Sequence, residues 1–275
     1  MTSPNSDAYF PPDQSPIRTS SIELFRAQVD QFRSSRHTAS MMGIVGGGPG
    51  TGKSTAAHLY LSEEEPKWQP PDQTCVMIDI MPLVTTKWLL ASIAYRTSDA
   101  PRSLTSQEAF QEALTALEQR RVQLLMLDNA DYLNLQHLEV LLALLRRSNC
   151  SVLLIGLPRL LTAFSTYPKI EARVVLSLPF PSLSDEEVFA TFLPQLHLPR
   201  WMYDPQNEKD LLMGKYLWRK CRPSLRRLRV ILTSASLLAQ LHGSPTITLE
   251  TIHLAIQLTS HEERPSSTQD GEEDV

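Results

Sequence analysis

Residues 41–61 read MMGIVGGGPGTGKSTAAHLYL, and this stretch decides the fold. It predicts a short apolar strand from Met42 to Val45, a glycine-rich turn, and a helix from about Lys53 to Leu61. The turn satisfies the pattern GxxxxGK[ST] between Gly47 and Ser54, in the strand–loop–helix context that the pattern requires. The sequence therefore predicts a phosphate-binding P-loop.

The chemistry of such a loop follows from its geometry. Glycines let successive backbone N–H groups curl around phosphate oxygens, and the positive end of the helix dipole adds to the attraction. Lys53 would reach the β- and γ-phosphates, and the Ser54 hydroxyl would ligate Mg²⁺. We therefore expect ATP and Mg²⁺ as ligands. The residues expected around the nucleotide are Gly47, Gly48, Pro49, Gly50, Thr51, Gly52, Lys53, Ser54 and Thr55.

A second group for the Mg²⁺ site is expected at the end of a neighbouring strand. Asp128 follows the apolar run 122–127 and is placed for this role, in the manner of a Walker B acid. Hydrolysing enzymes of this type usually carry Glu at the next position, where this chain has Asn129. An amide cannot accept a proton from water at neutral pH, and Asp131 is displaced from that position. We expect slow or absent ATP hydrolysis.

The segments around the P-loop alternate between strands and helices, which predicts an α/β fold with a parallel sheet. The expected strands are residues 74–80, 122–128, 151–157 and 174–180, and the expected helices are 86–97, 106–120 and 135–147. A first helix is predicted to start at Ser20, where Ser20 and Glu23 form a capping-box pattern.

Strand signals nearly stop after residue 182, and the rest of the chain reads as a small helical domain. Ser184 and Glu187 are expected to cap one helix, and further helices are predicted over residues 208–220, 224–241 and 249–260. The first 19 residues are rich in proline and predict a flexible arm. The last residues, 262–275, hold six acidic residues and one arginine, and predict a disordered acidic tail.

Composition and charge limit the possible classes of protein. The 275 residues are 42% hydrophobic and 20% charged, and 26 Lys and Arg face 30 Asp and Glu for a net charge of -4. This net charge excludes a basic electrostatic field over the whole molecule, although it is compatible with a local strip of basic residues. The three cysteines match no metal-binding spacing and indicate a reducing compartment. No apolar run is long enough to cross a bilayer, so we expect a cytoplasmic protein without membrane partners.

The order of motifs over about residues 20–260 resembles the AAA+ ATPases that regulate transposition, the TniB/TnsC group, with MuB as a more distant relative. The resemblance rests on GGGPGTGKST, LLMLDNADYL, VLLIGLPRL, EARVVLSLPFPSLSDEEV and a closing helical lid. It implies an AAA+ α/β core over residues 20–181 and a helical lid over 182–260. The flexible arm over 1–19 and the acidic disordered tail over 261–275, both expected from composition, lie outside the resemblance.

The resemblance also implies roles at single positions. Arg173 matches the arginine finger, which would reach the ATP of a neighbouring subunit in an oligomer. Arg227 matches the lid arginine called sensor 2, with Arg226 as a competing choice. Sensor 1, usually a polar residue, is Leu157 here. Asn129 and Leu157 both fall at positions that handle the attacking water, so the chain keeps its binding residues and changes its hydrolytic ones.

Members of this group polymerise on duplex DNA as rings or helical filaments. By position, Lys87 and Thr105 match the residues that grip the DNA backbone, and Arg102 is a neighbouring addition. An ordinary solvated helix residue is the alternative for Lys87. The resemblance further implies a DDE transposase and a TniQ-like targeting protein as partners. CRISPR-associated transposons are among the transposons in which such a regulator is expected.

Two other classes of protein stay open. Signalling switches of the STAND class also carry a P-loop followed by LLxLDN and hydrolyse slowly, but they normally have a long sensor domain after the lid. A small-molecule kinase would instead need a substrate pocket over the sheet. The function expected first is ATP-dependent assembly on DNA that links target selection to a transposase.

Overall fold

A computed structural model describes residues 16–35, 41–69, 71–97, 105–163 and 167–261. The chain divides into two compact units, Met1–Leu183 and Ser184–Val275. Each unit is described by itself below.

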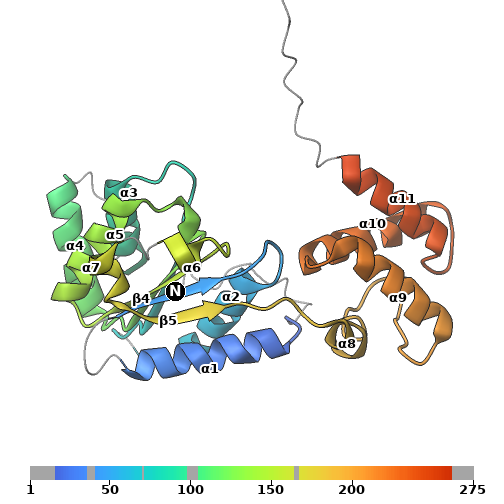
Figure 1. Cartoon of the computed structure of the whole chain (residues 1–275), viewed down its shortest axis with the longest axis horizontal. Helices are drawn as coiled ribbons and strands as arrows, with labels where there is room; N and C mark the ends of the chain where they lie inside the picture. Colours follow the sequence, from blue (N-terminus) through green and yellow to red (C-terminus); the bar gives the residue numbers. More distant parts are fainter. Residues whose placement is uncertain (1–15, 36–40, 70, 98–104, 164–166, 262–275) are drawn as a thin grey trace, which may run out of the picture. The chain divides into compact units, whose positions relative to one another are not determined.

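The first unit is built on a parallel five-stranded sheet (Figure 1). Its strands are β1 (Met42–Gly46), β2 (Cys75–Asp79), β3 (Leu124–Asp128), β4 (Ser151–Gly156) and β5 (Val174–Pro179). They lie in the order β2-β3-β4-β1-β5, and every neighbouring pair is parallel. The α/β fold expected from the alternation of elements is therefore confirmed. In a parallel sheet all carboxyl ends of the strands meet at one edge, which brings the segments after β1, β2 and β3 together.

Helices cover both faces of the sheet. They are α1 (Ser20–Ser35), α2 (Lys53–Glu64), α3 (Thr86–Thr97), α4 (Ser106–Gln119), α5 (Leu135–Arg147), α6 (Leu160–Ala163) and α7 (Pro168–Glu171), with 3₁₀ turns η1 (Glu65–Lys67) and η2 (Ala130–Tyr132). Alternate strand residues point to opposite faces: Met77 and Met126 pack with α1 and α2, whereas Ile78 and Leu127 pack with α3, α4 and α5. Burial on both faces explains why the strands read as continuous apolar runs.

The start of α1 differs from the expectation in its cap. The helix begins at Ser20 as predicted, but Thr19 is the capping residue, because Ile22 N donates to Thr19 Oγ1 at 3.4 Å. The chain is anchored slightly before the helix. Ile17 is buried, and Arg18 pairs with Glu23 and Glu63. Residues 16–19 of the expected arm therefore pack against the first unit, and residues 1–15 lie outside the described residues.

The second unit is helical. Its elements are α8 (Asp185–Glu187), the π-helical turn η3 (Val188–Phe192), α9 (Glu208–Cys221), α10 (Leu225–Leu241) and α11 (Leu249–His261). The expected cap at Ser184 is present, because Ser184 Oγ accepts from Glu187 N at 3.1 Å. Thr248 caps α11 in the same way, with Oγ1 accepting from Thr251 N at 3.3 Å. The buried Trp218 donates to Asp185 Oδ1 at 2.8 Å and ties α9 to α8.

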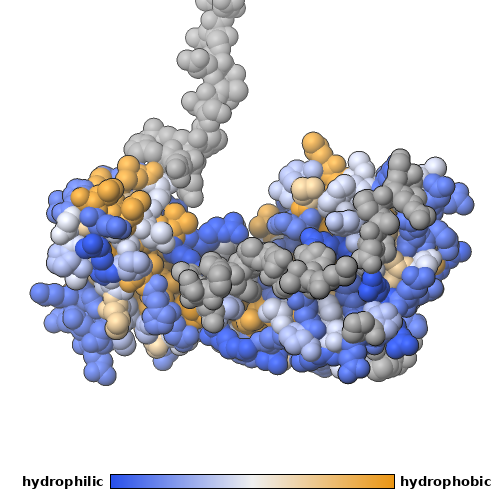
Figure 2. Space-filling view, turned by 180° about the vertical axis from the view of Figure 1, so that it is seen from behind, coloured by the Kyte–Doolittle hydropathy of each residue, from blue (hydrophilic) through white to orange (hydrophobic). Residues whose placement is uncertain are grey.

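Large apolar side chains gather on the surface of this unit (Figure 2). Four of them come in pairs spaced one helical turn apart: Leu237 and Leu241 on α10, and Leu254 and Leu258 on α11. Exposed apolar patches of this kind mark surfaces that bind other surfaces. Within the described residues, no helix is both long and apolar enough to cross a membrane.

Candidate nucleotide-binding site

The glycine-rich loop connects the carboxyl end of β1 to the amino end of α2. Gly52 is the N-cap of α2, with φ of 106°, a left-handed conformation that only glycine adopts at low cost. The Thr51 hydroxyl donates to Gly48 O at 2.9 Å and closes the loop on itself. The first N–H groups of α2 have no acceptor within the helix, so they point along its axis into the loop. This is the geometry of a phosphate cradle.

Lys53 lies inside the loop. Its Nζ donates to Gly47 O and to Gly48 O, both at 2.7 Å, and the residue is buried. These bonds fold the side chain back onto the carbonyls of the loop, so the ammonium group lies inside the cradle. The loop therefore holds the lysine charge where a triphosphate would need it.

Ser54 and Asp128 meet at the carboxyl edge of the sheet, where β3 ends beside α2. Burial raises the pKa of Asp128, and the hydrogen bond with the Ser54 hydroxyl opposes this rise. Hydroxyl and carboxylate oxygens suit Mg²⁺, which is usually held by one or two side chains together with phosphate oxygens and water. The described residues contain no group of three or more His, Cys, Asp or Glu that could hold a metal ion by themselves. The pair fits a nucleotide-bound Mg²⁺.

Asn129, directly after Asp128, has a left-handed backbone with φ of 54° and ψ of 36°. Asparagine tolerates this conformation better than most residues. Its Nδ2 donates to Asp79 Oδ1 at 2.6 Å, so the amide is bound to a carboxylate from the end of β2. Sequence reasoning missed Asp79, although its position after an apolar run matches that of Asp128.

Asp131 is hydrogen-bonded to the loop after β4. Its Oδ2 accepts from Leu157 N at 2.8 Å, and Arg159 Nε lies 3.5 Å from its Oδ1. The side chain is only 8% exposed. The carboxylate of Asp131 is therefore directed toward the backbone of Leu157, which agrees with its displacement from the position expected for a hydrolytic acid.

The replacement Gly156→Ala should destabilise the first unit, because the new Cβ would lie 2.4 Å from Asp131 Oδ2. Displacing this buried carboxylate breaks a charge-assisted hydrogen bond, at a cost of about 1.5–3 kcal/mol. Thermal denaturation should show a lower Tm. In the background Asp131→Ala the contact is gone, so Gly156→Ala should then cost much less. An equal loss in both backgrounds would contradict the proposed overlap.

Arg173 lies at the opposite edge of the sheet from the P-loop. Its carbonyl oxygen accepts from Met42 N at 2.9 Å, at the amino end of β1. The five residues of β1 separate it from Gly47, which corresponds to about 16 Å along a strand. Arg173 is therefore too far from the P-loop of its own chain to touch a nucleotide there. In the second unit, Arg227 is half-buried near the start of α10, and Arg226 is exposed.

Lys87 lies at the amino end of α3, and Thr105 lies at the amino end of α4. Arg120 Nε donates to Thr97 O at 2.9 Å, which joins the carboxyl ends of the two helices. At their amino ends, hydrogen bonds from Thr105 lower the pKa of Glu108, and the Lys87 charge adds to this effect. The two helices therefore run in the same direction and present both residues on one surface. Arg102 lies outside the described residues.

The loop between β2 and α3, residues 80–85, is apolar at its tip. Leu83 is 97% exposed with φ of 63°, and Met81 is 53% exposed. An exposed leucine in a left-handed conformation combines backbone strain with unfavourable hydration, a combination typical of functional loops. It directly precedes the surface that carries Lys87.

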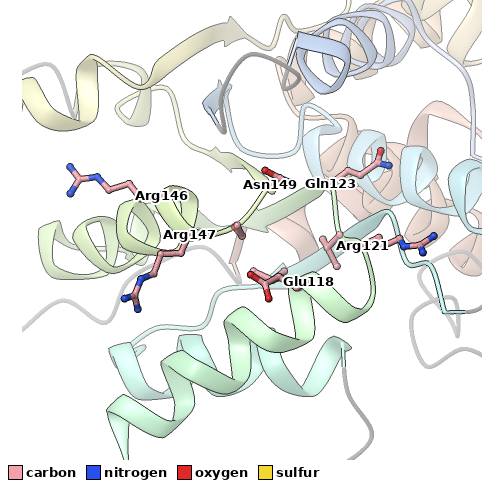
Figure 3. A pocket seen from close by; sticks show the side chains of 9 residues that line it. Glu118, Arg121, Gln123, Arg146, Arg147 and Asn149 are labelled. Carbon is pink, nitrogen blue, oxygen red and sulfur yellow. The ribbon is translucent and has the colours of Figure 1, made fainter.

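A cavity of about 730 Å³ lies at the amino edge of the sheet, between the ends of α4 and α5 (Figure 3). Two of its polar side chains are bonded to neighbouring residues: Arg121 pairs with Asp72 at 3.3 Å, and Gln123 Oε1 accepts from Arg33 Nε at 2.8 Å. The P-loop lies at the other edge. The cavity therefore does not support a kinase substrate site, which would have to face the nucleotide.

The parallel sheet in this strand order, the P-loop between β1 and α2, and the helical region at the carboxyl end define an AAA+ P-loop NTPase core. Residues 36–164 match the family model described as AAA domain. No curated protein matches the chain at significant similarity.

Three solved structures have the same fold at low sequence identity. The Aeropyrum pernix ORC2 protein, titled as ADPNP-ADP complexes, is 17% identical over 95% of this chain and 72% of its own, with a TM-score of 0.69. The Aeropyrum pernix ORC1 protein, titled as in complex with DNA, is 14% identical over 91% and 67%, with a TM-score of 0.70. Cdc6p from Pyrobaculum aerophilum is 18% identical over 89% and 69%, with a TM-score of 0.66.

Proposed function

We propose that this chain is an AAA+ regulator that binds ATP and Mg²⁺ and assembles on duplex DNA, with ATP held between adjacent copies. Lys53 and the amides at the start of α2 hold the phosphates, and Ser54 and Asp128 hold Mg²⁺. Hydrolysis is slow, because Asn129 stands where hydrolysing relatives carry an acid. The nucleotide acts mainly to drive assembly.

The observation that carries the DNA part of the proposal is the common surface of Lys87 and Thr105. The two residues are 18 positions apart in the sequence, yet α3 and α4 run side by side and start together. Thr105 Oγ1 accepts from Glu108 N, which fixes the threonine side chain at the amino end of α4 beside Lys87. Contacts from such residues to phosphates position a protein on DNA without reading its sequence.

The net charge of -4 is compatible with this function. Glu108 reduces the field of Lys87, so one subunit alone binds DNA weakly. A filament or ring repeats the same cation at every subunit, and the attraction to phosphates adds up along the duplex. DNA binding is therefore expected only together with assembly.

The position of Arg173 supports the assembly part of the proposal. An arginine at the amino edge of the sheet, about 16 Å from its own P-loop, can act on a nucleotide only in another copy. The solved structure of the similar Aeropyrum pernix ORC1 protein is titled as a complex with DNA, which agrees with a DNA partner for this fold.

The resemblance to TniB/TnsC regulators supplies the biological setting of the proposal. In that setting the assembled chain links a target site to a DDE transposase, with a TniQ-like targeting protein as a further partner. Arg227 from the second unit would add to the nucleotide contacts as sensor 2. These roles rest on the quoted sequence motifs.

Electron microscopy tests the proposed function directly. The full chain is mixed with duplex DNA in three conditions: no nucleotide, ATP, and a non-hydrolysable ATP analogue. Rings or filaments that need nucleotide, and that form with the analogue as well as with ATP, are the expected result. Monomers in all three conditions would refute the proposal.

Lys87→Ala should weaken binding to duplexes of every sequence to a similar extent, because a phosphate contact is lost rather than a base contact. The slope of log K against log salt should fall by about 1 for each subunit contact removed. Lys67→Ala removes the same charge from η1, on a different part of the unit, and is the matched control. Equal effects of the two variants would mean that Lys87 contributes only to net charge.

A further inference from the structure

An acid and an amide form a pair across the ends of β2 and β3. Asp79 and Asp128 are register partners in the two parallel strands, so their backbones end side by side. One residue further on, Asn129 turns back and donates from Nδ2 to Asp79 Oδ1 at 2.6 Å. The position that would carry a hydrolytic glutamate is thus bonded to a carboxylate from the neighbouring strand.

The carboxylates at the carboxyl edge of the sheet differ in their surroundings. Asp128 is 5% exposed and interacts with the Ser54 hydroxyl and with Asn129 N. Asp131 is buried and bonds to Leu157 N. Asp79 is exposed, and a carboxylate has two oxygens, so the bond to Oδ1 leaves Oδ2 able to accept from water.

Electrostatic contacts place Asp79 beside the P-loop helix. Burial raises the pKa of Asp128, and the Asp79 charge adds to this rise. Burial lowers the pKa of His58, and the Asp79 charge opposes this effect. His58 lies one turn after Ser54 on α2, so Asp79 lies near both the P-loop helix and Asp128.

We propose that Asp79 is the catalytic residue that orients the attacking water for ATP hydrolysis, and that Asn129 holds its carboxylate in place. In hydrolysing enzymes of this type the acid directly follows the position of Asp128, at the end of β3. Here the amide of Asn129 stands at that position, and the acid, Asp79, stands at the end of β2. This inference rests on the ATP binding of the proposed function, but not on DNA binding.

The hydrolytic step balances without a further reactant. The water oxygen bonds to the γ-phosphorus while Asp79 accepts a hydrogen bond from the water. The bond between the γ-phosphorus and the β,γ-bridging oxygen breaks, and its electron pair leaves on ADP. One proton of the water stays on the released phosphate and the other passes to solvent. Asp79 shares its role with the water-positioning residues of other P-loop enzymes.

Single-residue variants of the full chain test this role. Asp79→Asn keeps the size of the side chain and removes its charge. ATP affinity is measured with a fluorescent analogue, and phosphate release is measured with saturating ATP and Mg²⁺. We expect affinity within about threefold of the parent and a fall in release of at least about tenfold. Asp72→Asn, which removes an acid near the amino edge of the sheet, is the matched control and should leave release unchanged.

A second variant keeps the carboxylate and removes its partner. Asn129→Ala leaves Asp79 unrestrained, so release should fall severalfold while ATP affinity is retained. The inference is overturned if Asp79→Asn releases phosphate like the parent, if the parent binds ATP but releases none above background, or if Asn129→Ala releases phosphate at the parent rate or faster. A chain that does not bind ATP at all would refute the proposed function as well, whereas loss of DNA assembly alone would leave this inference standing.

Discussion

Replacing Lys53 with alanine is expected to lower the affinity for ATP by at least about 100-fold, which corresponds to about 2.7 kcal/mol. Lys53 Nζ bonds to the carbonyls of Gly47 and Gly48 inside the loop, so its charge is fixed where the β- and γ-phosphates would lie. Its removal takes away that charge and leaves the rest of the fold intact, because the strands and helices pack through other residues.

Thermal denaturation with and without ATP measures this effect. A ligand at 100 times its Kd stabilises the native state by about 2.7 kcal/mol, whereas a ligand at its Kd gives only about 0.4 kcal/mol, so ATP should raise the Tm of the parent chain much more than that of Lys53→Ala. Lys67→Ala removes a lysine outside the loop and should respond to ATP like the parent. If Lys53→Ala is stabilised by ATP as strongly as the parent, the loop is not the nucleotide site.

The elements of the sheet were predictable because the signals are local. Each strand of a parallel sheet is buried on both faces, so the segments 122–128 and 151–157 stand out as apolar runs. The P-loop is equally local, since Gly52, Lys53 and Ser54 are adjacent in the chain. Their offsets in the sequence are sufficient to predict their geometry.

Features that depend on register or on small energy differences were not predictable. The pair Asp79 and Asn129 requires the alignment of β2 with β3, which brings together residues 50 positions apart. The cap of α1 was placed one residue late, because Thr19 and Ser20 are adjacent hydroxyl residues and both fit a capping pattern. The short helices α6 and α7 carry too few residues to show a period.

Replacing Arg173 with alanine should separate ATP binding from assembly. The isolated subunit should keep its ATP affinity within about threefold, because Arg173 lies at the far edge of the sheet from its own P-loop. Nucleotide-dependent assembly on DNA should fall by at least about tenfold, since the arginine would act on the neighbour's nucleotide. Sedimentation of the chain with duplex DNA and ATP measures the assembled fraction.

Mixing the two alanine variants tests whether the arginine acts between copies. Lys53→Ala keeps Arg173, and Arg173→Ala keeps Lys53, so a junction formed by one subunit of each kind can contain an intact P-loop and an intact arginine. A mixture should therefore assemble on DNA better than either variant alone. If the mixture recovers nothing, or if Arg173→Ala alone loses ATP affinity as strongly as Lys53→Ala, then the nucleotide is not shared between adjacent subunits.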